Sequence, residues 1–212
     1  MKLVAFAFVA AAVASPGLAA STGLSGAWYK TTEVAGNSLA SAQAVVDGAA
    51  PDATFIATEL NYPQIARSNT LPTFLGGGAT GLSGDLASST AESVFLFEGL
   101  IQLEAGKNTF GVNADDGFRL SIDGQDVVSR DGLSDFGFKS GDFTAPVDGH
   151  YSFELLFFDG QATEIGLGVT LNDAFVNADI TKTGPTPIPV PAALPLLAAA
   201  LGAAGWMGRR RR

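Results

Sequence analysis

The sequence predicts an all-β domain built as an antiparallel sandwich or barrel. Three observations favour this fold class. Apolar and polar residues alternate along several short segments after residue 93. Turn-forming Gly and Asp residues separate these segments, for example at Asp123-Gly124 and Asp148-Gly149. About 165 residues lie between the two terminal segments, enough for one hydrophobic core, and the chain has no cysteine, so a single domain without disulfides is expected.

Six strands are expected in the second half of the chain. The segment 94–103 is apolar on both faces, as in a buried strand. Phe118, Leu120 and Ile122 alternate with polar neighbours, and the Asp123-Gly124 pair that follows is typical of a two-residue hairpin turn. The expected strands are residues 94–103, 108–114, 118–122, 125–129, 150–158 and 163–171.

Residues 36–92 specify their structure only weakly. They are rich in Ala, Ser, Gly and Thr, and three glycines follow one another at 76–78. Only residues 38–47 indicate a helix, because their apolar residues fall on one helical face and Gly48 would end it.

The first 20 residues have the pattern of a secretory signal peptide. Lys2 precedes an apolar stretch at 3–13, and small residues lead to Ala19 and Ala20, after which cleavage is expected. A buried N-terminal helix is the alternative. The signal peptide predicts that the protein is exported, with its β domain over residues 21–180.

The C-terminal residues 188–212 form a second targeting segment. An extended linker at 181–187 precedes the proline cluster Ile188-Pro189-Val190-Pro191-Ala192, an apolar run and four arginines at 209–212. Counted from Ile188 to Gly208, the apolar stretch is 21 residues long, about the length that crosses a bilayer core. The arginines are typical of a positive flank held in the cytoplasm.

This proline cluster resembles the Val-Pro-x-Pro-Ala motif of Gram-negative protein-sorting tails. Exosortase-type membrane proteases recognise such tails, so the resemblance implies cleavage near the motif and transfer to the cell surface or its polysaccharide matrix. A plain C-terminal anchor is the alternative. Both interpretations place residues 20–187 outside the cytoplasm and make the membrane a partner of the C-terminal helix before any processing.

The exported part is strongly acidic. It holds all 21 acidic residues and only 7 of the 12 basic ones, which gives a formal charge of −14. Such a charge repels phosphate backbones, and no basic stripe offsets it. Nucleic acid is therefore not expected as a partner, whereas divalent cations would stabilise the domain.

The available side chains argue against an enzyme. The chain has no cysteine, and its one histidine, His150, opens a strand beside a turn. Paired carboxylates hydrolyse glycosides across a cleft, whereas Asp115 and Asp116 adjoin in sequence. Glu154 and Glu164 are explained as outward-facing residues of alternating strands.

A calcium site is expected where two aspartates follow a strand. Asp115 and Asp116 share the loop at 113–117, and like charges so close repel each other unless a cation neutralises them. Calcium takes about six to eight oxygen ligands, so a second loop must contribute. The candidates are Asp159 and the backbone carbonyls of Gln161 and Thr163. Ordinary turn chemistry is the alternative explanation of the Asp pair.

The segment 98–124 resembles the centre of a PA14 domain, above all in Gly111-Val112-Asn113-Ala114-Asp115-Asp116-Gly117. Residues 23–29 and 149–158 resemble its flanks, so the resemblance covers residues 22–173. It implies a β-sandwich of a family found in bacterial glycosidases, toxins and yeast adhesins, often as a carbohydrate-binding module.

In the adhesin branch of that family, paired aspartates hold a calcium ion that contacts sugar hydroxyls, together with an Asn or Asp of a second loop. Asp115 and Asp116 match the pair, and Asp159 falls where the second-loop ligand would be. This chain departs from that branch in two respects, since the branch usually has Asn at that position and an aromatic residue after it.

The resulting hypothesis is a surface-sorted module that binds a glycan with the help of calcium, in adhesion or in an extracellular polysaccharide matrix. The loop at 130–141 would shape the glycan pocket, with Asp131 and Asp135 as polar contacts. The alternative is a structural envelope or matrix protein without a glycan ligand, in which calcium only stiffens loops. The aromatic residues considered for stacking on sugars are Trp28, Tyr29, Tyr62 and Phe136, although most aromatic residues of a β domain belong to its core.

Overall fold

The computed structural model describes residues 22–31, 37–66, 68–160 and 163–182. The expected signal peptide, the proline cluster with its apolar run, and Gln161 lie outside these residues. No helix within the described ranges is long and apolar enough to cross a membrane.

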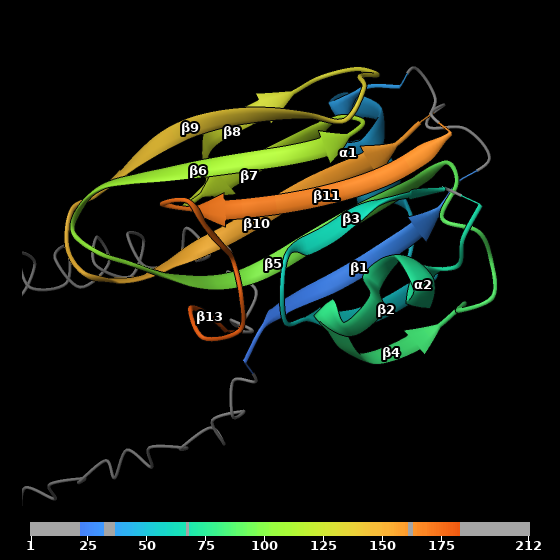
Figure 1. The fold of residues 1–212 in the computed structure, drawn as a ribbon, viewed down its shortest axis with the longest axis horizontal. Coiled ribbons are helices and arrows are strands. Elements are labelled where there is room, and N and C mark those ends of the chain that lie inside the picture. The colour runs from blue at the N-terminus through green and yellow to red at the C-terminus, as the bar shows by residue number, and fades with distance from the viewer. Residues whose placement is uncertain (1–21, 32–36, 67, 161–162, 183–212) are drawn as a thin grey trace, which may run out of the picture.

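Two antiparallel sheets pack face to face, which confirms the predicted all-β fold (Figure 1). One sheet has eight strands, which are β1 (Leu24–Lys30), β2 (Ala53–Ala57), β4 (Ala79–Gly84), β5 (Ser93–Leu103), β7 (Phe118–Ile122), β8 (Gln125–Arg130), β10 (Gly149–Asp159) and β13 (Thr181–Lys182). The other has five strands, which are β3 (Asn61–Ala66), β6 (Gly106–Asp115), β9 (Gly137–Ala145), β11 (Glu164–Leu171) and β12 (Ala174–Phe175). The strand orders are β4-β2-β1-β5-β10-β7-β8, with β13 paired to β5, and β12-β11-β6-β9, with β3 paired to β11.

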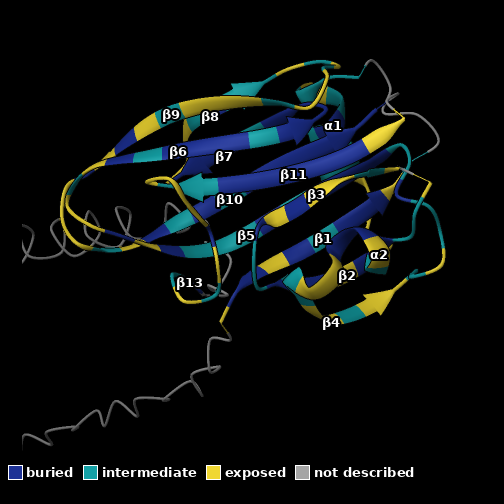
Figure 2. Ribbon diagram, viewed as in Figure 1, coloured by how far each residue is buried: buried dark blue, intermediate teal, exposed yellow. Residues whose placement is uncertain are grey.

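The core lies between the two sheets and is rich in aromatic rings. Strand alternation turns one set of side chains inward, and both β6 and β11 are buried along most of their length (Figure 2). Phe95 lies 5.5 Å from Phe157 and 6.3 Å from Phe97, measured between ring centroids. Phe110 is also fully buried, on the facing sheet. Tyr62 of β3 lies 6.2 Å from Phe97 of β5, so aromatic contacts join the two sheets.

The helix α1 (Leu39–Gly48) covers the outer face of the eight-stranded sheet, in the region where the sequence predicted a helix. Ser38 caps it, because its Oγ accepts a hydrogen bond from the Ser41 N–H at 3.2 Å. Ala42 is fully buried in a small cluster that includes Leu156 and Phe158 of β10. The helix therefore packs directly on β10, the strand that ends at Asp159.

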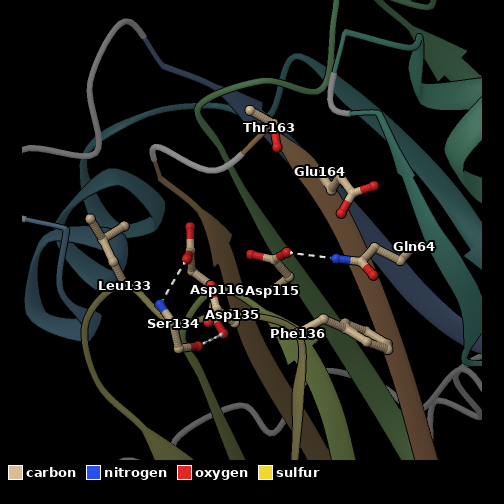
Figure 3. Close-up of a pocket in the computed structure, with 9 residues that line it drawn as sticks. All are labelled: Gln64, Asp115, Asp116, Leu133, Ser134, Asp135, Phe136, Thr163 and Glu164. Atoms are coloured by element: carbon tan, nitrogen blue, oxygen red, sulfur yellow. Dashed lines mark hydrogen bonds between the residues drawn. The ribbon is translucent and has the colours of Figure 1, made fainter.

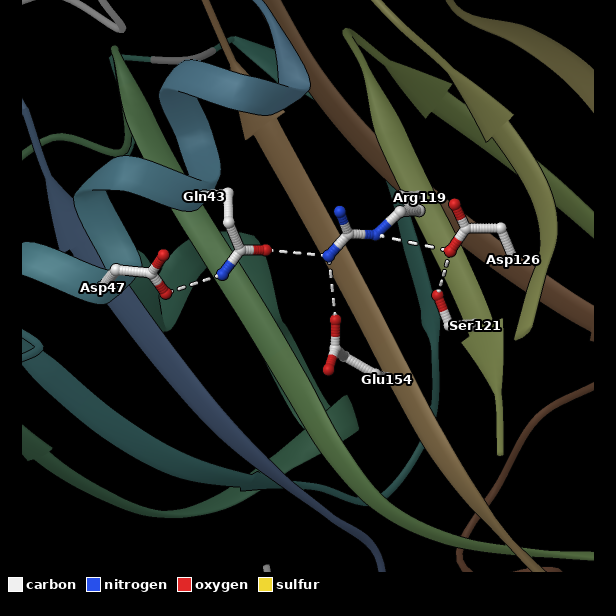
Figure 4. A network of polar contacts seen from close by, with 6 residues as sticks. All are labelled: Gln43, Asp47, Arg119, Ser121, Asp126 and Glu154. Atoms are coloured by element: carbon white, nitrogen blue, oxygen red, sulfur yellow. Dashed lines mark hydrogen bonds and ion pairs between the residues drawn. The ribbon is translucent and has the colours of Figure 1, made fainter. Parts of the chain in front are cut away.

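A network of polar contacts fixes α1 to this sheet (Figure 4). Arg119 of β7 donates one hydrogen bond to the Gln43 Oε1 of the helix at 2.7 Å and another to Glu154 of β10 at 3.0 Å. Gln43 in turn donates to Asp47 at 2.9 Å. Glu154 forms an ion pair with Arg119, and its side chain is 43% exposed, so this residue faces outward as expected.

The first half of the chain holds more regular structure than its sequence indicates. β2, β3, β4, the short helix α2 (Leu71–Leu75) and the 3₁₀ turn η1 (Gly76–Gly78) all lie in the weakly patterned region. β2 is paired on both sides, with β1 and with β4. Neighbouring strands supply the hydrogen bonds here, so tertiary context decides the structure where the local pattern is weak.

Two predicted boundaries differ from the structure. The loop expected at 130–141 is shorter, because β8 continues to Arg130 and β9 already begins at Gly137, opposite Ala114 of β6. Thr181 and Lys182, expected in the linker, pair with β5 as β13. In both cases backbone pairing extends the sheet through residues whose side chains carry no strand pattern.

The chain changes sheets at Asp115-Asp116-Gly117. β6 belongs to the five-stranded sheet and β7 to the eight-stranded sheet, so the aspartates lie where the two sheets meet. A Cβ at Gly117 would lie 2.4 Å from Cε1 of Phe158 and 3.0 Å from the carbonyl oxygen of Arg130. The crossing therefore requires glycine directly after the Asp pair.

Candidate metal and ligand site

A cavity of about 860 Å³ lies at this end of the sandwich (Figure 3). Three parts of the chain form its walls: the end of β6, the loop 131–136 between β8 and β9, and the paired strands β3 and β11 with the residue before β11. Its lining residues are Gln64, Asp115, Asp116, Leu133, Ser134, Asp135, Phe136, Thr163 and Glu164.

Asp116 ties together the loops around the cavity. Its Oδ1 accepts a hydrogen bond from the Ser134 N–H at 2.9 Å, and its Oδ2 accepts one from the Gly160 N–H at 2.8 Å. Its own N–H donates to the Phe158 carbonyl at 3.2 Å, and the Asp115-Asp116 peptide bond is cis. The Asp116 carboxylate is therefore held in one orientation by two segments far apart in the sequence.

Asp115 has a different environment. It is the last residue of β6, is only 4% exposed, and its Oδ2 accepts a hydrogen bond from Gln64 Nε2 at 3.1 Å. Its Oδ1 is buried and has no hydrogen-bond partner among the described residues. An unsatisfied buried carboxylate oxygen is costly, so this atom is the best candidate in the cavity to contact a ligand.

The electrostatics of the cavity work against the charged form of Asp115. Burial raises the pKa of Asp115 from its ordinary value of 3.8 to about 6, and the neighbouring Asp116 raises it too. The Gln64 hydrogen bond lowers the pKa, whereas Asp135 and Glu164 add smaller increases. A bound cation would offset all of these repulsions at once.

Arg130, the last residue of β8, holds the loop 131–136 against the sandwich. Its Nη1 donates hydrogen bonds to the carbonyl of Ala114 at 3.4 Å and to Ser134 Oγ at 3.1 Å. Its guanidinium carbon lies 5.7 Å from the centre of the Phe118 ring. The half-buried guanidinium of Arg130 thus anchors one wall of a cavity that is otherwise acidic.

The loop also contributes apolar surface. Leu133 is 46% exposed and Phe136 is 38% exposed, and both line the cavity. The other aromatic residues considered for sugar stacking, Trp28, Tyr29 and Tyr62, are buried. Phe136 is therefore the one member of that set that can meet a ligand in the cavity.

The structure brings together four of the seven residues expected in the site. Asp115, Asp116, Thr163 and Asp135 line the cavity. Asp131 instead accepts a hydrogen bond from the Leu39 N–H at the start of α1, at 2.7 Å. The buried Asp159 accepts one from the Glu92 N–H at 2.9 Å and does not line the cavity. Gln161 lies outside the described residues.

Four lining residues were not expected as site residues from the sequence: Gln64, Leu133, Ser134 and Glu164. Gln64 lies in β3, 51 positions before Asp115, in the weakly patterned half of the chain. Leu133 and Ser134 directly precede Asp135 in the loop that was expected to shape the pocket, so the sequence did indicate this loop. Glu164 was correctly placed on an outward position, but only the pairing of β11 with β6 brings it to the cavity.

The oxygen donors of the cavity suit a hard cation such as calcium. Asp115 Oδ1 accepts no hydrogen bond from the part of the chain that the structure describes, and each Asp116 oxygen accepts one N–H and still has a lone pair for a cation. Within the described ranges, no three His, Cys, Asp or Glu side chains are grouped so as to hold a metal ion. Backbone carbonyls, hydroxyls, water or ligand oxygens would thus have to complete a calcium shell around the Asp pair.

Comparison with known proteins shows which solved structures this fold resembles. No family model and no curated protein matches the chain. Among solved structures, the PA14 domain of the antifreeze protein MpAFP matches with a TM-score of 0.71 and 27% identity, over 84% of this chain and 100% of that one. The PA14 sugar-binding domain of an RTX adhesin matches with a TM-score of 0.68 and 27% identity, over 77% of this chain and 99% of that one.

These similarities define the class of domain, since both neighbours are PA14 domains aligned over almost their whole length. The chain carries a PA14-like β-sandwich, as its central motif indicated. A more distant match shows the fold alone: the A domain of epithelial adhesin 6 from Candida glabrata, solved in complex with Galβ1-3GlcNAc, has a TM-score of 0.54 at 13% identity, over 81% of this chain and 92% of that one.

Proposed function

We propose that this protein is an exported carbohydrate-binding module that holds a glycan through calcium at Asp115 and Asp116. One observation carries the proposal: the buried Oδ1 of Asp115 has no hydrogen-bond partner within the described ranges, and Asp115 lines a cavity of about 860 Å³ beside a second carboxylate. That volume is within the usual range of small-ligand pockets. The RTX adhesin domain, described as sugar-binding, supports a glycan as the ligand class.

Asp115 and Asp116 would hold the ion, and the carbonyls of Gln161 and Thr163 are the proposed additional donors. Calcium, when bound, supplies a positive centre for sugar hydroxyl oxygens. The chain prepares this position in advance, because two backbone N–H groups already fix the Asp116 carboxylate. Asp159 would not contact the ion. Its hydrogen bond with the Glu92 N–H would hold the end of β10 in place, so that the next residue, Gly160, can donate its N–H to Asp116.

The remaining lining residues would orient the sugar. Leu133 and Phe136 offer exposed apolar surface on which the C–H face of a sugar ring can pack. Asp135, Gln64 and Glu164 offer polar groups around the same cavity for its hydroxyls. A cavity with a few polar groups and one apolar wall is typical of a binding site.

We propose binding rather than catalysis. Glycoside hydrolysis uses two carboxyl groups that face each other across the scissile bond. Asp115 and Asp116 are consecutive, and each oxygen of Asp116 accepts a backbone hydrogen bond that fixes its carboxylate in place. His150 lies on β10 opposite Gln102, at the other end of the strand from Asp159, so it cannot serve as a base in this cavity.

The positions of the two ends of the domain support display at a surface. Gly23 donates a hydrogen bond from its N–H to the Thr181 carbonyl at 3.2 Å, and β1 and β13 both pair with β5, so the two ends of the domain lie close together. Thr181 pairs with Ile101, whereas Asp159, at the cavity end, pairs with Ser93 of the same strand. Eight residues of β5 separate these points, about 26 Å. An anchor or sorting tail after Lys182, cut by an exosortase-type protease, would present the cavity away from the membrane.

A second candidate is a structural envelope or matrix protein without a glycan ligand. Asp116 favours it, because this residue already joins two loops and calcium could simply stiffen them. The two candidates differ in what calcium permits. Calcium-dependent retention of a glycan supports the first, and a higher unfolding temperature in calcium with no glycan bound supports the second.

A glycan array probed with the full chain in mild detergent, with calcium and with EGTA, tests the proposal. We expect binding that EGTA abolishes and that Asp115→Asn and Asp116→Asn each reduce at least tenfold. The matched control is Asp179→Asn, which removes an exposed carboxylate elsewhere. Glycan binding that is unaffected by EGTA, or no binding at all, would contradict the calcium-dependent glycan site.

A further inference from the structure

The outer face of the five-stranded sheet carries three exposed phenylalanine rings next to the cavity. Phe136 lies in the loop before β9, Phe138 lies on β9 and is 60% exposed, and Phe175 lies on β12 and is 42% exposed. Exposed aromatic rings gathered on one face of a sheet are unusual for a surface that only meets water.

Each ring rests against a glycine of the same face. A Cβ added at the glycine would approach the ring closely: 2.5 Å from Phe138 at Gly111, 2.8 Å from Phe136 at Gly166, and 3.4 Å from Phe175 at Gly168. Because no side chain stands beneath them, the rings lie low over the strands and are supported from below. A ring that is already held in place loses little conformational freedom when a ligand packs on it.

This face is continuous with the cavity. Gly166 is paired directly with Asp115, and Phe136 lies both against Gly166 and in the cavity wall. From Asp115 the face continues along β6 to Gly111, four residues or about 13 Å away. A ligand longer than one sugar residue would therefore pass from the cavity onto the rings.

The chemistry of the face suits a neutral polyhydroxylated chain. Between Asp115 and Asp142, its polar side chains are uncharged, for example Asn113 on β6 and Thr170 on β11. Asp142 itself is paired with Lys107 at 3.0 Å. On a domain with a formal charge of −14 over its exported part, an uncharged strip with aromatic rings favours a neutral ligand over a charged one.

We propose that the outer face of β6, β9, β11 and β12 is an extension of the glycan site. It would bind consecutive residues of a neutral polysaccharide, with Phe138 and Phe175 stacking on sugar rings that lie beyond the residue in the cavity. This inference rests on the proposed carbohydrate-binding function and adds to it the ligand class, a polymer rather than a single sugar.

Affinity electrophoresis tests this extension. The full chain, in mild detergent with calcium, is run through native gels that contain dextran, pullulan, galactomannan or the acidic polymer alginate. We expect at least one neutral polysaccharide to retard the wild type, and the double variant Phe138→Ser/Phe175→Ser to raise the apparent Kd for it about tenfold. Val147→Ser is the matched control, because it removes an exposed apolar side chain away from this face.

A second variant leaves both rings in place. Gly168→Val places a side chain beneath the Phe175 ring and so displaces the ring from its position on the sheet. Because valine is well tolerated in strands, the variant should weaken retardation without unfolding the domain. Failure of every neutral polysaccharide to retard the wild type, or equal retardation of the wild type and the double variant, would overturn the inference. A wild-type dimer that the double variant converts to monomer in light scattering would overturn it too, since the face would then join two copies of the chain.

The glycan array separates this inference from the proposed function. In one outcome, small glycans bind in a calcium-dependent way that Asp115→Asn abolishes, but replacing Phe138 and Phe175 does not change the retardation. This outcome contradicts only the extension of the site. In the other outcome, retardation depends on these rings, but no small glycan binds in a calcium-dependent way. This outcome contradicts the calcium site and supports the sheet face as an independent binding surface.

Discussion

Replacement of Asp115 by Asn probes the electrostatic origin of the site. Burial raises the pKa of Asp115 to about 6, and the nearby Asp116 raises it as well. Asn has almost the same shape, keeps an oxygen that can accept the Gln64 hydrogen bond, and carries no charge. Without metal, we therefore expect Asp115→Asn to be more stable than the wild type at pH 7.

Proton linkage makes this gain depend on pH. Between the ordinary pKa of 3.8 and the raised value of about 6, the folded protein binds more protons at Asp115 than the unfolded chain does. The contribution of Asp115 to stability therefore falls as the pH rises through this window and stays low above it. The pKa change corresponds to about 3 kcal/mol, which screening by water in the open cavity reduces to about 2 kcal/mol.

Urea unfolding in EGTA at several pH values from 4 to 7 measures the effect. The quantity to compare is the free energy of unfolding of Asp115→Asn minus that of the wild type, since other carboxylates titrate equally in both proteins. We expect a difference near zero at pH 4 that grows to about 2 kcal/mol in favour of the variant at pH 7. Calcium at pH 7 should then stabilise the wild type more than the variant.

Asp179→Asn is the control for removal of an exposed carboxylate, and it should change stability equally little at every pH. A difference between Asp115→Asn and the wild type that does not change from pH 4 to pH 7 would refute the reasoning. So would a variant that is less stable than the wild type in EGTA at pH 7, because the Asp115 carboxylate would then be favourable in the fold without any cation.

Three further predictions concern packing and the cavity wall. Gly117→Ala should cost about 2 kcal/mol in urea unfolding, because its Cβ would clash with a buried ring, whereas Gly77→Ala, with open space around it, should be nearly neutral; equal effects would contradict this. Arg130→Met should weaken calcium-dependent glycan binding about tenfold in array titrations by releasing the loop 131–136, and unchanged binding would argue against the loop as part of the site. Phe95→Ala should cost about 3–5 kcal/mol and Phe138→Ala less than about 0.5 kcal/mol, and similar costs would mean that the assigned core is wrong.

Six strands after residue 93, namely β5, β6, β7, β8, β10 and β11, could be predicted because their inward side chains belong to one aromatic core. β9, β12 and β13 were not predicted, since β9 is mostly exposed and the other two are only two residues long. In β7, Phe118, Leu120 and Ile122 are fully buried, and the expected hairpin turn follows, with positive φ at both Asp123 and Gly124. In β2 the same signal is only five residues long, and in β3 it is interrupted by Pro63. Their pairing partners lie far away in the sequence, so only the assembled sheet specifies them.

The Asp pair and the loop beside it could be found from the sequence, whereas the wall that β3 contributes could not. Two consecutive aspartates after a strand are visible in any window of the chain. Gln64 reaches Asp115 only because β3 pairs with β11 and β11 pairs with β6. No local sequence pattern predicts these two pairings. Asp131 shows the opposite case, since a loop position that indicated ligand binding serves the start of α1 instead.

The two adjacent aspartates have come to perform different tasks, and their surroundings explain why. Asp116 faces backbone donors on both sides, and its hydrogen bonds to Ser134 and Gly160 determine where the loops lie. Asp115 ends a strand whose outward side borders the cavity, where it meets one amide and three other carboxyl groups. Loss of Asp116 should therefore disturb both the loops and any bound cation, whereas loss of Asp115 should remove the cation alone, a distinction that explains why Asp115 is the cleaner position at which to test the site.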